Sequence, residues 1–276
     1  MKNKKLKRNF ESFGDIDDEI LYSVETDYIP VLTRLIFICF KENYSNESQR
    51  DIIDFIDEHP EAAEQYGNNF YKGDESLLAV FLKGVGAERF RKVERVVDCF
   101  IRNGASLNNC SIHLYGGVYP ILAYLCWKPF LNNSEMEQIA RALKVDFKTH
   151  EKLNNKDLFF VNSLLYVFKY FKEHHGNLKP KGYCMADLIL QKLDWEVDYT
   201  DEFLESLYNL IKYLVKNNSY SDSSFEFFID KINEKSQESE YSFMIFDLLD
   251  NVCEPPKDKW CLKKYNILKE YYSDLS

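Results

Sequence analysis

Tyr28-Ile29-Pro30-Val31-Leu32 and Val118-Tyr119-Pro120-Ile121-Leu122 are near twins, and their prolines lie 90 positions apart. Glu75-Ser76-Leu77-Leu78-Ala79 stands close to halfway between them, and Asn162-Ser163-Leu164-Leu165-Tyr166 continues the series. Alignment on the shared leucine of each segment gives steps of 46, 44 and 43 residues, for Leu32, Leu78, Leu122 and Leu165. Self-similarity at a period of about 20 to 50 residues is typical of stacked-repeat architectures, which usually serve as binding scaffolds.

Each of these segments begins a short apolar stretch that is followed by a second, more amphipathic one. The clearest second stretch is Phe90 to Ile101, whose apolar residues recur every three or four positions while charged residues occupy the other face. It ends at Asn103-Gly104, a pair suited to a left-handed helix C-cap. Its predecessor, Ser76 to Lys83, is too apolar to be exposed, so we expect it to be the inner helix of a hairpin.

The alternation of short and longer helices predicts about six helical hairpins. Their inner and outer helices are expected at 30–40 with 51–58, 76–83 with 90–101, 120–127 with 135–143, 162–171 with 185–193, 203–215 with 225–232, and 242–249 with 262–271. Capping boxes at Ser48-Gln49-Arg50-Asp51 and Ser134-Glu135-Met136-Glu137 precede two outer helices, and Pro30 and Pro120 are expected at the first helical position. Such hairpins bury their apolar faces by stacking, so we predict one helical repeat domain over 21–276.

Composition supports an all-α fold for a chain of 276 residues. Apolar residues make up 45% and aromatic residues 16% of the chain, which excludes intrinsic disorder as its general state. Glycine and proline are few, at 10 and 7, so helices are favoured over a loop-rich β design. A generic helical bundle with hairpins at similar spacing remains an alternative to the repeat.

The formal net charge of −10 opposes a general affinity for nucleic acid and favours a protein partner that is basic. Basic residues from Lys2 to Arg8 are followed by acidic ones up to Glu19, which predicts a charged, partly disordered terminus over 1–20; a nuclear address is the alternative. We expect neither a secretory signal nor a membrane span, because no apolar run is long enough.

Cysteine usage indicates a reducing compartment. The chain has seven cysteines, an odd number at irregular spacings, and several lie inside apolar helical stretches. We therefore expect a cytoplasmic protein, with a nuclear location or delivery into a host cell as open alternatives.

The block from Glu75 to Asn109 resembles an ankyrin repeat. Ser76-Leu77-Leu78 stands where that family has a Thr-Pro-Leu-His turn, and Gly104-Ala105-Ser106-Leu107-Asn108 is similar to its Gly-Ala-Asp-Val-Asn ending. The resemblance implies a helical-hairpin solenoid that binds proteins. Leucines occupy the positions of the turn histidines, so the hydrogen bonds between neighbouring turns are expected to be missing. A HEAT-like or irregular helical solenoid is the alternative, since its repeats run about 40 to 47 residues.

No pattern of catalytic or metal-binding residues stands out. The five histidines, His59, His113, His150, His174 and His175, lack the spacing that places two ligands on one helix face. His174-His175-Gly176 is expected to cap the end of a helix. We therefore predict no catalytic residue, cofactor, metal or small-molecule substrate, and an enzyme of unrecognised type remains an alternative.

Aromatic and lysine residues near the ends of inner helices are the candidate partner-binding residues, because solenoids usually present their binding surface there. They are Lys83, Tyr115, Tyr119, Trp127, Lys128, Tyr166, Lys169, Tyr170 and Lys172. The predicted function is a non-catalytic interaction scaffold, of adaptor or effector type. The alternative is an acidic immunity protein that masks a basic partner.

Overall fold

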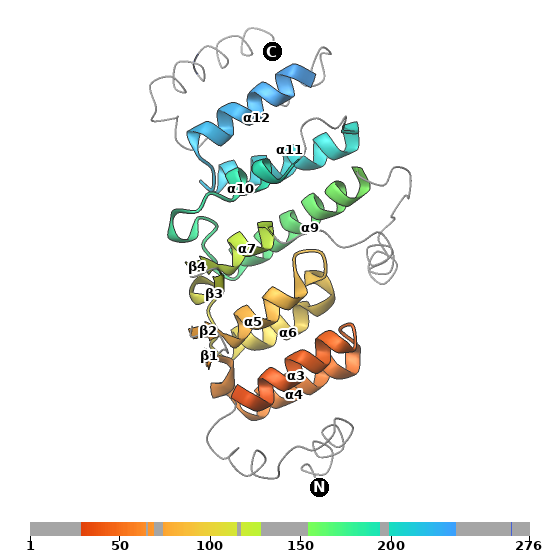
Figure 1. Ribbon diagram of the computed structural model, residues 1–276, viewed down its shortest axis with the longest axis vertical. Coiled ribbons are helices and arrows are strands. Elements are labelled where there is room, and N and C mark those ends of the chain that lie inside the picture. Colours follow the sequence, from red (N-terminus) through yellow and green to blue (C-terminus); the bar gives the residue numbers. More distant parts are fainter. Residues whose placement is uncertain are drawn as a thin grey trace.

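The computed structural model describes residues 29–64, 66–68, 74–114, 117–127, 154–193, 199–235 and 266 (Figure 1). Within these residues the chain is mainly helical, as the composition predicts, with little β-structure. The α-helices are α3 (Ile29–Lys41), α4 (Asn46–Glu58), α5 (Leu77–Val85), α6 (Phe90–Arg102), α7 (Ile121–Trp127), α9 (Asn154–Glu173), α10 (Met185–Lys192), α11 (Asp201–Lys216) and α12 (Asp222–Lys235).

The helices form two rows that run along the elongated molecule (Figure 1). In the inner row α3 packs on α5, α5 on α7, α7 on α10 and α10 on α12. In the outer row α4 packs on α6 and α9 on α11, while ring contacts join α6 to α9. Consecutive helices of opposite rows form the hairpins α3–α4, α5–α6 and α10–α11. The described helices therefore form two packed rows, in which six of them pair as hairpins.

The pairing predicted for residues 162–171 and 185–193 is wrong. The first stretch belongs to α9, which begins at Asn154 and lies in the outer row against α11. The second stretch is α10, which lies in the inner row between α7 and α12. The inner and outer order predicted for 203–215 and 225–232 is also reversed, since α11 packs on α9 and α12 packs on α10. Periodicity identifies the buried face of a helix but not its neighbour, and residues 128–153 separate α7 from α9 in sequence. The helices predicted at 135–143, 242–249 and 262–271 lie outside the described residues, apart from residue 266.

Two short antiparallel hairpins lie at one edge of the stack (Figure 1). β1 (Tyr66–Asn68) pairs with β2 (Asp74–Ser76) between α4 and α5, and β3 (Ser111–Leu114) pairs with β4 (Gly117–Pro120) between α6 and α7. β2 also contacts β3, so the two hairpins are neighbours. Three short 3-10 helices lie in the connections of the described chain: η2 (Pro60–Glu64), η3 (Leu107–Asn109) and η4 (Pro180–Gly182).

Helix ends follow local side-chain chemistry. Ser76 caps α5 by accepting a hydrogen bond from the amide of Ala79 at 3.1 Å, and Gly104 follows α6 with φ +101°. The cap of α4 is Ser45, which accepts from the amide of Ser48. The capping box predicted at 48–51 is therefore wrong, because α4 begins earlier and Ser48 is buried inside it. Pro30 is the second residue of α3, and Pro120 directly precedes α7.

One continuous apolar core runs through both rows. The aligned leucines of the inner row, Leu32, Leu78 and Leu122, are all buried in it. Leu165, the fourth member of that alignment, belongs to the outer row and is only partly buried. The described part of the chain holds no helix long and apolar enough to cross a membrane.

Candidate functional site

The residues predicted to bind a partner lie in three separate places. Lys83 is in the last turn of α5, and Trp127 ends α7 in the same row. Tyr119 is in β4, at the hairpin edge. The remaining described members are on α9 of the outer row, namely Tyr166, Lys169, Tyr170 and Lys172. Tyr115, Lys128 and the side chain of Trp127 lie outside the described residues.

Tyr166 and Tyr170 form a seam between α9 and α6. The Tyr166 hydroxyl donates to a carboxylate oxygen of Glu94 at 2.5 Å, and the Tyr170 hydroxyl donates to Asp98 at the same distance. The guanidinium of Arg91 lies 4.1 Å from the centre of the Tyr166 ring. Tyr170 is only 3% exposed and packs edge-on against Phe90. These contacts hold α6 and α9 together, and Tyr170 offers a partner almost no surface.

The seam shifts the titration of both tyrosines. Burial, followed by the hydrogen bond to Glu94, raises the pKa of Tyr166 to about 12. Burial, followed by the hydrogen bond to Asp98, also raises the pKa of Tyr170 above its ordinary value. A phenol that donates to a carboxylate keeps its proton, because ionisation would place two negative charges side by side. Both tyrosines are therefore neutral donors at physiological pH.

His174 and His175 end α9 as predicted. His175 adopts φ +60°, its amide donates to Lys172 O, and the amide of Gly176 donates to Phe171 O. These two backbone hydrogen bonds are the pair that defines a Schellman cap. The ring of His174 also stacks on Tyr170 at 4.1 Å and lies 3.7 Å from Asp98, so it extends the seam.

Hydrogen bonds of asparagine and serine side chains join neighbouring connections at one edge of the stack. Asn108 donates to His175 O at 3.1 Å and accepts from the amide of Asn177 at 2.6 Å. Ser219 accepts from the amide of Met185 and donates to Leu178 O. Asparagine and serine side chains thus tie neighbouring connections together. At the same edge, the ring of Tyr119 lies 6.2 Å from that of Tyr183.

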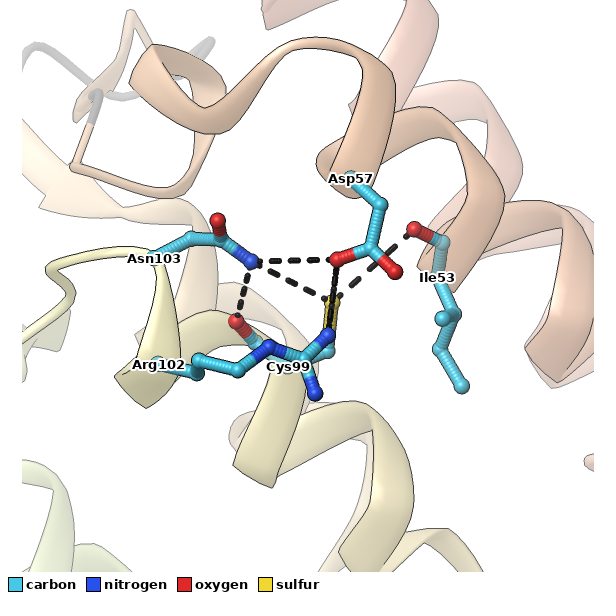
Figure 2. A network of polar contacts seen from close by, with 5 residues as sticks. All are labelled: Ile53, Asp57, Cys99, Arg102 and Asn103. Atoms are coloured by element: carbon cyan, nitrogen blue, oxygen red, sulfur yellow. Dashed lines mark hydrogen bonds and ion pairs between the residues drawn. The ribbon is translucent and has the colours of Figure 1, made fainter.

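A second polar network joins α4 to α6 (Figure 2). A carboxylate oxygen of Asp57 accepts from Arg102 at 2.7 Å and from Asn103 at 3.3 Å, and the thiol of Cys99 lies 3.5 Å from it. Hydrogen bonding, chiefly from Arg102, lowers the pKa of Asp57. Burial, followed by the charge of Asp57, raises the pKa of Cys99 to about 11. A buried, protonated thiol is a poor nucleophile, so the network is a structural tie.

The exposed and partly buried residues along one side of the first three inner helices form a surface, which we call the inner face. Arg34, Phe37 and Lys41 follow one another on α3 at spacings of three and four, as do Val80 and Lys83 on α5. With Leu32, Leu78 and Leu122 aligned, Phe37 occupies the register of Lys83 and Trp127, and Arg34 that of Val80 and Tyr124. The inner face is thus defined by Arg34, Phe37, Lys41, Val80, Lys83 and Tyr124.

Phe37 is the most exposed large apolar residue of the described chain, at 59%. The sequence prediction included Lys83 but missed Phe37, because all of its aromatic candidates lie in later segments of the chain. The signal was present, since Phe37 lies five positions after Leu32, as Lys83 lies five after Leu78 and Trp127 five after Leu122.

No protein-family model matches this chain, and no similar curated protein or solved structure was found. The function must therefore be argued from the geometry alone. Among the described residues, no group of three or more histidine, cysteine or acidic side chains could hold a metal ion. What the described surface offers is an aromatic and basic inner face, and an outer face on α4 that is rich in acids.

Proposed function

We propose that this protein is a non-catalytic scaffold that binds a protein partner, built as a divergent ankyrin-like stack. The observation that carries the proposal is the inner face, where Phe37 stands exposed in the same register as Lys83 on the next helix. Exposed aromatic residues on a rigid support serve as anchors at protein interfaces. The rigid support here is the inner row, whose helices pack directly on one another.

Support for the ankyrin-like form comes from the edge of the stack. Ankyrin repeats combine a β-turn with two helices, whereas HEAT repeats consist of helices. The hairpins β1–β2 and β3–β4 occupy the turn position between successive units. The inner helices begin at residues 29, 77, 121, 185 and 222, which are 48, 44, 64 and 37 positions apart, so the proposed stack is irregular.

Selection from a displayed peptide library on the full-length protein tests this proposal. Bound peptides should slow amide hydrogen exchange across at least two neighbouring inner helices, because a scaffold presents one surface built from several units. Failure to select any binder, or protection confined to the buried seam between α6 and α9, would contradict it. Buried amides of α11 serve as an internal reference for global stability.

A second candidate function is the masking of a basic partner by an acidic surface. The exposed residues of α4 and η2 include six acids against the single basic residue Arg50; the acids are Glu47, Asp54, Asp57, Glu58, Glu61 and Glu64. A basic partner would associate with this face in a salt-dependent way.

A lysine-rich peptide is the probe for this candidate. Replacing Asp54, Glu58 and Glu61 by their amides should weaken its binding, and binding should fall as salt rises. The same replacements leave the inner face intact, so they separate the two functions. An affinity that is equal at low and high salt would rule out the masking function.

A further inference from the structure

We propose that the outer surface where α4 meets α6 binds an acidic segment of a protein partner. The binding residues are three exposed arginines, Arg50 on α4 and Arg91 and Arg95 on α6, which we call the arginine patch. The patch is a second surface, beyond the inner face of the proposed scaffold function. The net charge of −10 predicts a basic partner instead. Exposed charges act over a screening length of about 8 to 10 Å, so local charge decides which partner is favoured at contact.

Arg50 and Arg95 lie on facing turns of α4 and α6. The guanidinium of Arg95 donates to Asn46 Oδ1 at 3.2 Å. One turn further on, the thiol of Cys99 lies 3.9 Å from Ile53 O. Arg50 lies between Asn46 and Ile53 on α4, at spacings of four and three. It therefore faces the turn of α6 that carries Arg95.

Arg91 lies one turn before Arg95 on α6. The two residues are four positions apart and are therefore neighbours on the helix surface. The guanidinium of Arg91 lies 4.1 Å from the centre of the Tyr166 ring, which supports one of its flat faces. A stacked guanidinium keeps its N–H groups at the edge of its plane, where a carboxylate can accept two of them. Arg91 is thus oriented before binding, which lowers the entropy cost of association.

No carboxylate is paired with the arginine patch within the part of the chain that the structure describes. There, the guanidinium of Arg91 contacts the ring of Tyr166, and that of Arg95 donates to the neutral amide of Asn46. The side chain of Arg50 makes neither a hydrogen bond nor an ion pair with these residues. All three positive charges are therefore available to a partner.

Lys92 adds a fourth positive charge beside the patch. Its ammonium group donates to Asn43 O at 2.6 Å, which is a neutral acceptor. Burial, followed by the positive charge of Arg89, lowers the pKa of Lys92. Repulsion between the two cations indicates that positive charge is crowded at this end of α6.

The two acidic residues of α6 are bonded to α9. Glu94 accepts a hydrogen bond from Tyr166, and Asp98 accepts one from Tyr170. His174 of α9 also lies 3.7 Å from Asp98. Both carboxylates are thus held in the seam between α6 and α9.

The acidic residues of α4 leave the side of Arg50 positive. Three of them lie about a quarter of a turn round the helix from Arg50, and they are Glu47, Asp54 and Glu58. Asp57 shares the side of Arg50, but it is paired with Arg102 at 2.7 Å (Figure 2). The outer surface is therefore basic over the joint between α4 and α6, and acidic on the far side of α4.

The spread of the patch favours a segment with several carboxylates over a single phosphate group. Arg91 contacts Tyr166 on α9, whereas Arg95 reaches the other way, to α4. Separate carboxylates along one peptide can each meet one of these diverging arginines, and each such pair forms two parallel hydrogen bonds. Recognition of acidic motifs by arginine clusters is a recurring mode of peptide binding.

Fluorescence anisotropy with the full-length protein tests the proposal. The probe is a labelled peptide of about a dozen residues in which glutamate alternates with serine, a length that crosses both helices when extended. The comparison probe has glutamine in place of every glutamate. We expect only the acidic peptide to bind, and its affinity to fall as salt is added.

The variant R91Q/R95Q should weaken binding of the acidic peptide at least about tenfold, and R50Q about threefold. R91K/R95K keeps both charges and removes the planar fork, so its affinity should lie between those of R91Q/R95Q and the unaltered protein. Circular dichroism verifies folding. If R91Q/R95Q does not fold, R50Q and R91K/R95K still test the patch.

The matched control is K212Q/K216Q on α11, another helix of the outer row. It also removes two positive charges four positions apart, and the ammonium group of Lys212 lies 5.6 Å from the centre of the Tyr208 ring, as Arg91 lies against Tyr166. This control should bind the acidic peptide as the unaltered protein does.

Three outcomes overturn the inference. Equal binding of the two peptides, or equal weakening by K212Q/K216Q, means that the arginine patch does not recognise acidic segments. Tighter binding of a single-stranded oligonucleotide of equal charge, lost in R91Q/R95Q, means that the patch serves a nucleic acid. If the acidic peptide fails to bind while displayed peptides still protect the inner helices, the patch is excluded and the scaffold function stands. If the displayed library also yields no binder, both proposals fall.

Discussion

The inner and outer rows hold neighbouring hairpins together by different means. Inner helices meet through apolar side chains such as Phe40 against Phe81. Outer helices are joined by polar bonds as well, among them Arg95 to Asn46 at 3.2 Å, Arg102 to Asp57, and Tyr170 to Asp98. Apolar burial is strong but non-directional, whereas hydrogen bonds require particular partners. Both rows contribute to the one continuous apolar core, and the polar bonds of the outer row also help to specify which helices are neighbours.

The largest effect is expected from removing a ring of the inner row. F81A should lower the free energy of unfolding by about 3 to 5 kcal/mol, because Phe81 is fully buried between Phe40 and Phe100. Urea denaturation measures the loss. The control is F37A, which removes the exposed ring that contacts Phe40. It should lower the free energy of unfolding by less than about 1 kcal/mol. Equal costs would mean that burial of the Phe81 ring in the core does not stabilise the fold.

Loss of one polar bond in the outer row should cost less. Y170F should lower the free energy of unfolding by about 1.5 kcal/mol, since it removes a hydrogen bond to a carboxylate and keeps the ring. D57N is the matched change in the exposed network, whose partners Arg102 and Asp57 are 62% and 46% exposed, and should cost about 0 to 1 kcal/mol. A greater loss of stability from D57N than from Y170F would show that the Asp57 network contributes more than the seam between α9 and α6.

The seam between α9 and α6 makes the stability of the fold depend on pH in the alkaline range. The pKa of Tyr166 is about 12 in the folded state, against an ordinary value of 10.0, so the unfolded chain loses this proton first. The stabilisation is therefore complete below pH 10 and is lost as pH rises towards 12. Cys39 and Cys99, whose pKa values are raised to about 11 from 9.0, start the decline near pH 9.

Urea midpoints between about pH 8 and about pH 12 test this dependence. The double variant Y166F/Y170F should flatten the decline above pH 10 and leave the part due to the thiols. A decline of the same slope in that variant would show that the tyrosines do not control it.

The smallest expected effect is the change in stability caused by replacing Gly84, and the sign of that change tests the packing of the inner row. G84A should destabilise the protein by up to about 1 kcal/mol, because overlap with the ring of Phe40 outweighs the better helix propensity of alanine. When Phe40 is also replaced by alanine, the same G84A change should become stabilising by about 0.5 to 1 kcal/mol. Thermal unfolding of the four proteins in this cycle measures both values. An unchanged sign would mean that Phe40 does not constrain position 84.

Helix positions were largely predictable from sequence, because they depend on local patterns. Residues 90–101 carry an unbroken apolar period and end at Gly104, and the structure places α6 at Phe90–Arg102. The start of α4 was placed too late, since Ser45 and Ser48 both suit a cap and only the folded chain shows which one accepts the amide bond. The β-hairpins were not located, because strands of three or four residues are too short to display alternation.

The candidate site was less predictable. Lys83 and Phe37 share a register that the leucine alignment already contains, so this part could be found from sequence. The spacing of Tyr166 and Tyr170 fits a buried helix face as well as it fits an exposed anchor, so the sequence alone does not distinguish the two. Their partners Glu94 and Asp98 lie 72 positions away, and no local pattern links them.

The sequence by itself determined the mainly helical class, most helix limits and the burial of three of the four aligned leucines, Leu32, Leu78 and Leu122. These properties follow from apolar period, capping residues and propensity within about 15 residues. Only the tertiary structure decided that α9 belongs to the outer row and α10 to the inner row, and that Phe37 is exposed while Tyr170 is buried. The reason is that the contacts between rows join residues distant in sequence, and an apolar stripe fits more than one neighbour until the whole stack is assembled.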